Sequence, residues 1–162
     1  MIILTKTPQF QEFHIEGINH ISPVAAYEAV KMGEAIILDV REENELDYES
    51  ILLDEVMYHP MSEIMDRLQH IPNDKLIIVA CPGGVRSSKV ANLLVMQGFK
   101  AVANLDGGLM MWKMQGLPFE SHASMGCGCG SHCDASENEV SSADCGCGCS
   151  TTSTGDSCGS CC

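Results

Sequence analysis

A run of five apolar residues, from Leu76 to Ala80, places the strongest constraint on the fold of this chain. No polar residue alternates within the run, which is typical of a strand covered on both faces, as in a parallel sheet. The residues that follow the run are Cys81, Pro82, Gly83 and Gly84. We therefore expect a central buried strand that delivers one thiol to a tight loop.

The loop after Cys81 has the composition of a backbone cradle. Pro82 has no N–H, whereas Gly83 and Gly84 let the backbone turn inward without a Cβ clash, so the remaining amides can point at one spot. Ser87 or Ser88 is expected to cap the helix that follows. The apolar face of this helix is predicted to consist of Val90, Ala91, Leu94 and Val95. The positive end of the helix would favour a nucleophilic thiolate at Cys81.

The rest of the first 120 residues alternates between predicted strands and helices. Strands are predicted at residues 2–5, 19–21, 35–38, 56–58 and 101–105, and the helices begin near Ser22, Glu42, Met61 and Gly107. This alternation with short connections implies an α/β fold with a parallel sheet, in which ligands bind at the carboxyl ends of the strands. We expect Asp39, Cys81 and Asp106 to surround one crevice there.

Three motifs, in the same order along the chain, resemble the rhodanese family. They are Leu-Asp-Val-Arg-Glu at residues 38–42, the loop that begins at Cys81, and Leu-Asp-Gly-Gly at residues 105–108 with Trp112 after it. The resemblance covers roughly residues 17–120. It implies a single rhodanese-like domain with a central parallel sheet flanked by helices, and a sulfurtransferase activity that needs no cofactor in the domain.

The resemblance also implies roles for individual residues. Cys81 would accept a sulfur atom as a persulfide and pass it to a thiophilic acceptor. The predicted substrate-binding residues are Pro82, Gly83, Gly84, Val85 and Arg86, and the residues predicted to support them are Asp39, Arg41, Ser87, Gly107 and Gly108. For Arg86 two roles stay open, because its planar guanidinium suits both a structural carboxylate and an anionic substrate group.

The length of the loop distinguishes sulfur transfer from the main alternative. Phosphatases of similar architecture have a longer loop between cysteine and arginine, whereas four residues separate Cys81 from Arg86 here. A tighter ring suits a single sulfur atom. The loop has no charged side chain between its ends, so thiosulfate, polysulfide and a protein persulfide all stay open as donors, with thiols or a protein as acceptors.

The sequence divides into three parts, and the last of them holds most of the cysteines. Residues 1–16 are an extension without an assigned function, residues 17–120 form the predicted domain, and residues 121–162 form a low-complexity tail that cannot bury a core. The tail holds nine of the ten cysteines, namely Cys127, Cys129, Cys133, Cys145, Cys147, Cys149, Cys158, Cys161 and Cys162. Cys-x-Cys pairs of this kind suit Zn²⁺ or Cu(I).

The tail therefore gives an alternative function, in which the domain is a scaffold and the protein mainly binds or senses a soft metal. Sulfur handling, disulfides and a tail without function are the other interpretations. The formal net charge of −13 argues against nucleic acid or an anionic membrane as a partner. With no apolar run long enough for a membrane span or a signal peptide, we expect a cytoplasmic protein with reduced thiols.

Histidines and methionines of the domain are not expected to carry function. His20, His59 and His70 have no partner that the sequence identifies. The seven methionines between Met57 and Met114 are predicted to fill the core rather than to bind metal.

Overall fold

The computed structural model of the protein describes residues 2–122. The nine cysteines of the predicted tail, and the metal site predicted for them, lie outside these residues and stay predictions. None of the helices in the described part is both long enough and apolar enough to cross a membrane.

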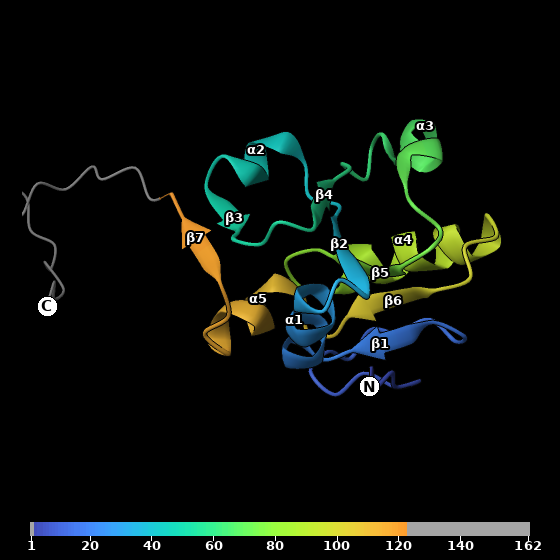
Figure 1. Ribbon diagram of the computed structural model, residues 1–162, viewed down its shortest axis with the longest axis horizontal. Coiled ribbons are helices and arrows are strands. Elements are labelled where there is room, and N and C mark those ends of the chain that lie inside the picture. Colours follow the sequence, from blue (N-terminus) through green and yellow to red (C-terminus); the bar gives the residue numbers. More distant parts are fainter. Residues whose placement is uncertain (1, 123–162) are drawn as a thin grey trace, which may run out of the picture. The chain divides into compact units, whose positions relative to one another are not determined.

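A five-stranded parallel sheet forms the centre of the structure, in the order β1-β6-β5-β2-β4 (Figure 1). Its strands are β1 (Asn19–Ile21), β2 (Ala35–Asp39), β4 (Val56–Tyr58), β5 (Leu76–Ala80) and β6 (Val102–Leu105). The apolar run of the sequence is β5, and it is the middle strand, as predicted. The α/β fold with a parallel sheet is thereby confirmed.

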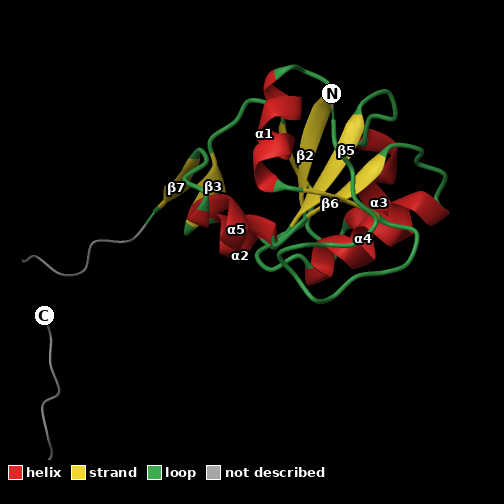
Figure 2. Ribbon diagram, turned by 90° about the horizontal axis from the view of Figure 1, so that it is seen from below, coloured by secondary structure: helices red, strands yellow, loops and turns green. Residues whose placement is uncertain are grey.

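Helices cover both faces of this sheet (Figure 2). α1 (Pro23–Lys31) and α5 (Gly108–Met114) lie on one face, and α3 (Ile64–Arg67) and α4 (Val85–Met96) lie on the other. Side chains of β5 alternate between the two cores: Ile77 and Val79 pack with Leu94 of α4, whereas Ile78 and Ala80 pack with the core that contains Trp112. Because both faces are covered, all five residues of β5 are buried, which explains why the run contains no polar residue.

The beginning of α1 agrees with the sequence prediction, whereas that of α4 does not. Ser22 caps α1, and its Oγ accepts a hydrogen bond from Ala25 N at 3.4 Å. The prediction that Ser87 or Ser88 caps α4 was wrong, because the helix begins earlier and Gly84 is its N-cap in a left-handed conformation. Both serines therefore lie inside the first turns of α4, where they are fully buried.

Shorter elements complete the structure at its margins. They are α2 (Glu43–Leu46), the 3-10 turn η1 (Leu68–His70), β3 (Glu49–Ile51) and β7 (Phe119–Ser121). β3 pairs antiparallel with β7. We did not predict this pair, because each strand has only three residues and carries no clear alternation of apolar and polar positions. The strand predicted at residues 2–5 is reduced to a single bridge between Thr5 and His20.

The prediction that methionines fill the core was wrong. Of the seven between residues 57 and 114, none is buried, and the most exposed are Met96 at 76% and Met114 at 77%. Val95, which we predicted to lie on the apolar face of α4, is also exposed, at 44%. The core consists instead of strand residues such as Ile77, Ile78 and Val79 together with helix residues such as Leu94, Leu109 and Trp112.

Trp112 gives a test of the packing between α1 and α5. The side chain is fully buried, its ring meets Tyr27 edge to face at 6.1 Å, and its Nε1–H donates to Pro118 O at 3.1 Å. Because Trp112→Ala leaves a cavity and removes the hydrogen bond to Pro118 O, it should lower the free energy of unfolding in urea by about 3–5 kcal/mol. Met114→Ala on the same helix is the control and should cost less than about 0.5 kcal/mol. Equal effects of the two substitutions would contradict this packing.

Candidate active site

The candidate site is built around the sulfur of Cys81, directly after β5. The thiol is buried, with 1% of the residue exposed. Its Sγ accepts hydrogen bonds from Gly84 N at 3.1 Å and from Ser87 N at 3.3 Å. The Oγ of Ser87 lies 3.2 Å away, at hydrogen-bond distance. Donors that converge on one sulfur stabilise a negative charge on it more than they stabilise a neutral thiol.

The first turn of α5 holds the other side of the loop. Leu109 N donates to Cys81 O at 2.9 Å, and Met110 N donates to Pro82 O at 3.0 Å. Because C=O and N–H point in opposite directions across a trans peptide, the amide of Gly83 is turned away from α5. The hydrogen bonds from α5 thus turn the carbonyls of Cys81 and Pro82 toward α5. The amide of Gly83 is left on the opposite, inner side of the loop.

Close approach between α5 and the loop depends on Gly108. A Cβ on Gly108 would lie 2.6 Å from Pro82 O and 2.7 Å from Gly84 N, and the residue has a φ of +62°. Any side chain would therefore push the loop away from α5. Gly107 precedes it with a φ of +73°, also in the left-handed region that favours glycine.

Arg86 points to a carboxylate of the protein. Its two terminal nitrogens donate to the oxygens of Glu45 at 2.6 and 2.7 Å, a bidentate pair. The hydrogen bond from Arg86 lowers the pKa of Glu45 to about 2, and the same contact raises the pKa of Arg86. Of the two roles left open for Arg86, the structure shows the pairing with a carboxylate, and contact with an anionic substrate stays a prediction.

Asp39 and Arg41 form a buried ion pair at the end of β2, beside β5. Arg41 donates through Nε and Nη2 to the carboxylate of Asp39, with a shortest distance of 2.7 Å. The side chain of Arg41 is 2% exposed and that of Asp39 is 0% exposed. Because the two opposite charges are buried in direct contact, each compensates the other. Val40 N, between them, donates to Ala80 O at 3.0 Å. The pair therefore fixes the strand next to the one that carries Cys81.

Asp39 and Asp106, which we expected to surround one crevice with Cys81, each have hydrogen-bond partners within the protein. The carboxylate of Asp106 accepts hydrogen bonds from Gln9 N at 2.6 Å and from Phe10 N at 3.2 Å. The N-terminal segment thus covers the end of β6, while Arg41 covers Asp39. Each carboxylate thus already accepts hydrogen bonds from the protein itself, and a crevice shared by the three residues stays a prediction.

A comparison with known proteins identifies the family. A family model, the rhodanese-like domain, matches residues 22–115. The chain belongs to the rhodanese-like family. This confirms the resemblance found in the three sequence motifs.

Relatives with known names are similar to most of this rhodanese-like domain. Thiosulfate sulfurtransferase GlpE of Coxiella burnetii is 34% identical over 93 residues, which covers 57% of this chain and 85% of that protein. A sulfurtransferase of Allochromatium vinosum is 31% identical over 85 residues, covering 52% and 78%. The crystal structure of a rhodanese-related protein from Thermoplasma volcanium superposes with a TM-score of 0.56 at 30% identity, covering 62% and 96%.

The N-terminal segment, to which we assigned no function, contributes to the surroundings of the rhodanese-like loop. A cavity of about 450 Å³ opens beside the loop, and its lining includes Phe10, Phe13, Gly83, Val85, Met110 and Met114. The signal that could have identified this contact is the presence of Phe10 and Phe13 in an otherwise polar stretch. Sequence alone does not say where these rings pack.

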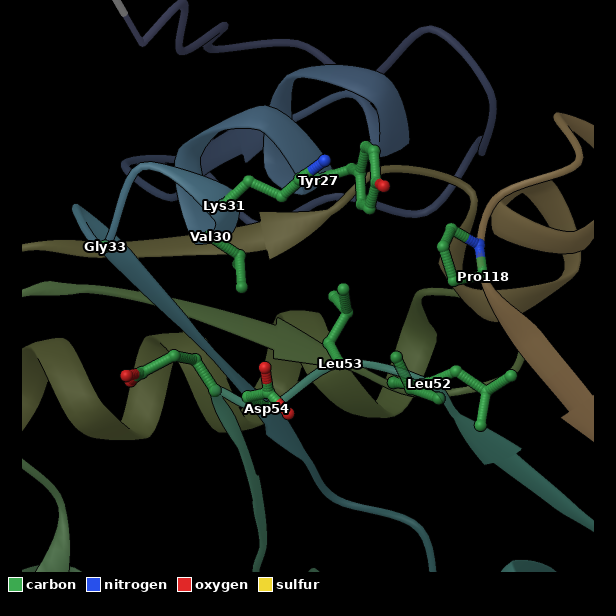
Figure 3. Close-up of a pocket in the computed structure, with 10 residues that line it drawn as sticks. Tyr27, Val30, Lys31, Gly33, Leu52, Leu53, Asp54 and Pro118 are labelled. Atoms are coloured by element: carbon green, nitrogen blue, oxygen red, sulfur yellow. The ribbon is translucent and has the colours of Figure 1, made fainter.

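Another cavity, of about 720 Å³, lies away from the loop (Figure 3). Tyr27, Val30 and Lys31 of α1 face Leu53 and Asp54 of the β3–β4 connection across it. Its lining contains no residue of the segment from Cys81 to Arg86. The larger of these two cavities therefore does not mark the candidate active site. That site is identified by the hydrogen bonds to Cys81 Sγ.

The three histidines make none of the hydrogen bonds described for the Cys81 loop, and Nδ1 of His20 lies 3.1 Å from Asn104 Nδ2. His20 and His59 are buried, and burial lowers the pKa of each. His70 is exposed.

The ion pair of Arg86 with Glu45 predicts how stability depends on pH. The pKa of Glu45 falls from 4.5 to about 2 on folding, so the pair stabilises the native state above the unfolded value and loses this effect as the pH falls toward 2. Urea unfolding of the wild type and Glu45→Gln should therefore differ at neutral pH, and the difference should shrink as the pH is lowered to about 3. A difference that stays constant over this range would contradict the pairing.

Proposed function

We propose that this rhodanese-type enzyme transfers sulfane sulfur through a persulfide on Cys81. The observation that carries the proposal is the set of polar groups around the sulfur: the donors Gly84 N and Ser87 N and the hydroxyl of Ser87, all within 3.3 Å of Sγ. Relatives named as sulfurtransferases support the same chemistry. Cys81 is also the only cysteine within the described residues.

Sulfur transfer would take place in two displacements at sulfur. The Cys81 thiolate attacks the terminal sulfur of the donor, a new S–S bond forms, and the old bond breaks. The leaving group keeps the electron pair and is sulfite for thiosulfate or a shortened chain for polysulfide. An acceptor thiolate then attacks the outer sulfur, and Cys81 leaves as a thiolate, so atoms and charge balance over the cycle.

The backbone amides suit both steps. Hydrogen bonds to a charged sulfur are stronger than those to a neutral one, so Gly84 N and Ser87 N stabilise Cys81 as the attacking group and again as the leaving group. Once the persulfide has formed, the negative charge resides on the outer sulfur. The inward-facing amides of the loop, including that of Gly83, are the groups available to hold it.

The donor is constrained by Arg86. Glu45 occupies both terminal nitrogens of Arg86, so an oxyanion donor such as thiosulfate must compete with a carboxylate of the protein. Polysulfide or a protein persulfide has no such requirement, because its terminal sulfur is bound by amides. We propose that these donors are used more efficiently than thiosulfate.

A mass measurement tests the role of Cys81. Incubation of the full chain with polysulfide should add about 32 Da, one sulfur atom, to the peptide that contains Cys81. Cys81→Ser should lose both this addition and the release of sulfide to an acceptor thiol. Peptide mapping is essential because the sequence has nine further cysteines. If a folded Cys81→Ser protein releases sulfide at the wild-type rate, Cys81 is not the sulfur carrier.

The proposed donor preference is tested by freeing Arg86. In Glu45→Gln the carboxylate charge is removed, so the KM for thiosulfate should fall by about two- to fivefold, the range expected for a partly exposed ion pair. The KM for polysulfide should change little. Glu43→Gln, on the exposed side of α2, is the matched control. An unchanged KM for thiosulfate in Glu45→Gln would show that Arg86 does not determine the donor.

A further inference from the structure

A short N-terminal segment, residues 9–13, crosses the active loop although it lies outside residues 22–115, the part matched by the family model. Its backbone is fixed to the end of β6, since Gln9 N and Phe10 N both donate to the carboxylate of Asp106. Upstream, Thr5 exchanges backbone hydrogen bonds with His20 of β1 at 2.8 and 2.7 Å. The segment is therefore attached to the sheet on the approach to the loop.

Gln11 is the residue of this segment that reaches the loop. Its Oε1 accepts hydrogen bonds from Gly107 N and from Asn104 Nδ2, each at 3.1 Å. On the other side, its Nε2 donates to Phe13 O at 2.5 Å within the segment, and it lies within hydrogen-bond distance of Ser88 Oγ at 3.3 Å and Gly84 O at 3.4 Å. One side-chain amide thus links the turn before α5 to the first turn of α4.

Gly84 is held tightly between Gln11 and Cys81. A Cβ placed on Gly84 would overlap the side-chain oxygen of Gln11, so the amide group lies directly against the Cα of Gly84. The N–H of the same residue donates to Cys81 Sγ at 3.1 Å. Any shift of Gly84 away from the sulfur would therefore require Gln11 to move or its hydrogen bonds to lengthen.

We propose that Gln11 is a positioning residue for sulfur transfer: it holds Gly84 so that the Gly84 amide stays on the sulfur of Cys81. The inference rests on the proposed function, and it assigns a working role to a segment outside the family domain. A hydrogen bond to a charged acceptor weakens steeply with distance and misalignment. Loss of the Gln11 amide would leave Gly84 held by Ser88 and by the close approach of Gly108, without the hydrogen bond from the N-terminal segment.

Two substitutions at Gln11 test the inference in the full-length protein. Gln11→Ala removes the side chain, and Gln11→Met keeps its length without the amide. Both should slow alkylation of Cys81 by iodoacetamide and lower kcat for persulfide formation by about tenfold, as expected when one charge-assisted hydrogen bond is weakened. The KM for the donor should change less than kcat, because the hydrogen bonds of Gln11 go to the loop and its supports and not to Cys81. Gln69→Ala, an exposed glutamine of η1, is the control of the same residue type.

Nuclear magnetic resonance separates positioning from a general loss of structure. In Gln11→Met the amide proton of Gly84 should move upfield, while that of Ser87, which also donates to Cys81 but has no hydrogen bond to Gln11, should move less. Wild-type alkylation rates and an unshifted Gly84 amide in both variants would overturn the inference. A rate loss that only follows the unfolded fraction in thermal melts would overturn it too. If wild-type protein forms no persulfide, but the Gly84 shift and alkylation change as described, the proposed function fails and the positioning role stands.

Discussion

The hydrogen bonds from Gly84 N and Ser87 N to the sulfur of Cys81 are the interactions on which the site depends. They exist because β5 ends at Ala80 and the N-cap of α4 is Gly84, only four residues later. The return of the chain within so few residues requires a left-handed N-cap, which glycine allows. α5 supports the turn from the other side, since its first amides bind the carbonyls of Cys81 and Pro82. The beginnings of two helices and the end of one strand thereby meet at the Cys81 loop.

Charged side chains near this site are mostly neutralised within the protein. Arg41 is paired with Asp39, Arg86 with Glu45, and Asp106 with two backbone amides. Stabilisation of negative charge on sulfur therefore comes from backbone dipoles, which are fixed by the fold and need no reorganisation during transfer. A site of this kind distinguishes substrates by the size and position of a sulfur atom more than by the charge of the donor. This is the physical basis for the donor preference that we propose.

Much of the architecture could be predicted from the sequence, because β5 is an uninterrupted apolar run and Ser22-Pro23 is an explicit helix start. The beginning of α4 could not, since the local preference of Ser87 and Ser88 for capping is overridden by the requirement that Gly84 turn toward Cys81. Contacts of Gln11 could not be predicted either, because Gln11 and Gly84 are 73 positions apart in the sequence. The exposure of Met110 and Met114 was missed because apolar spacing does not say which face of a short helix is covered.

A crystal structure of the sulfur-loaded protein, prepared with polysulfide under anaerobic conditions, tests the central claim most directly. We predict one additional sulfur atom bonded to Cys81 Sγ, facing the inner side of the loop within hydrogen-bond distance of its backbone amides, with Gln11 still in contact with Gly84. An unmodified Cys81 in a protein that carries sulfur on other cysteines would contradict the account. So would a Cys81 persulfide whose outer sulfur points away from the loop.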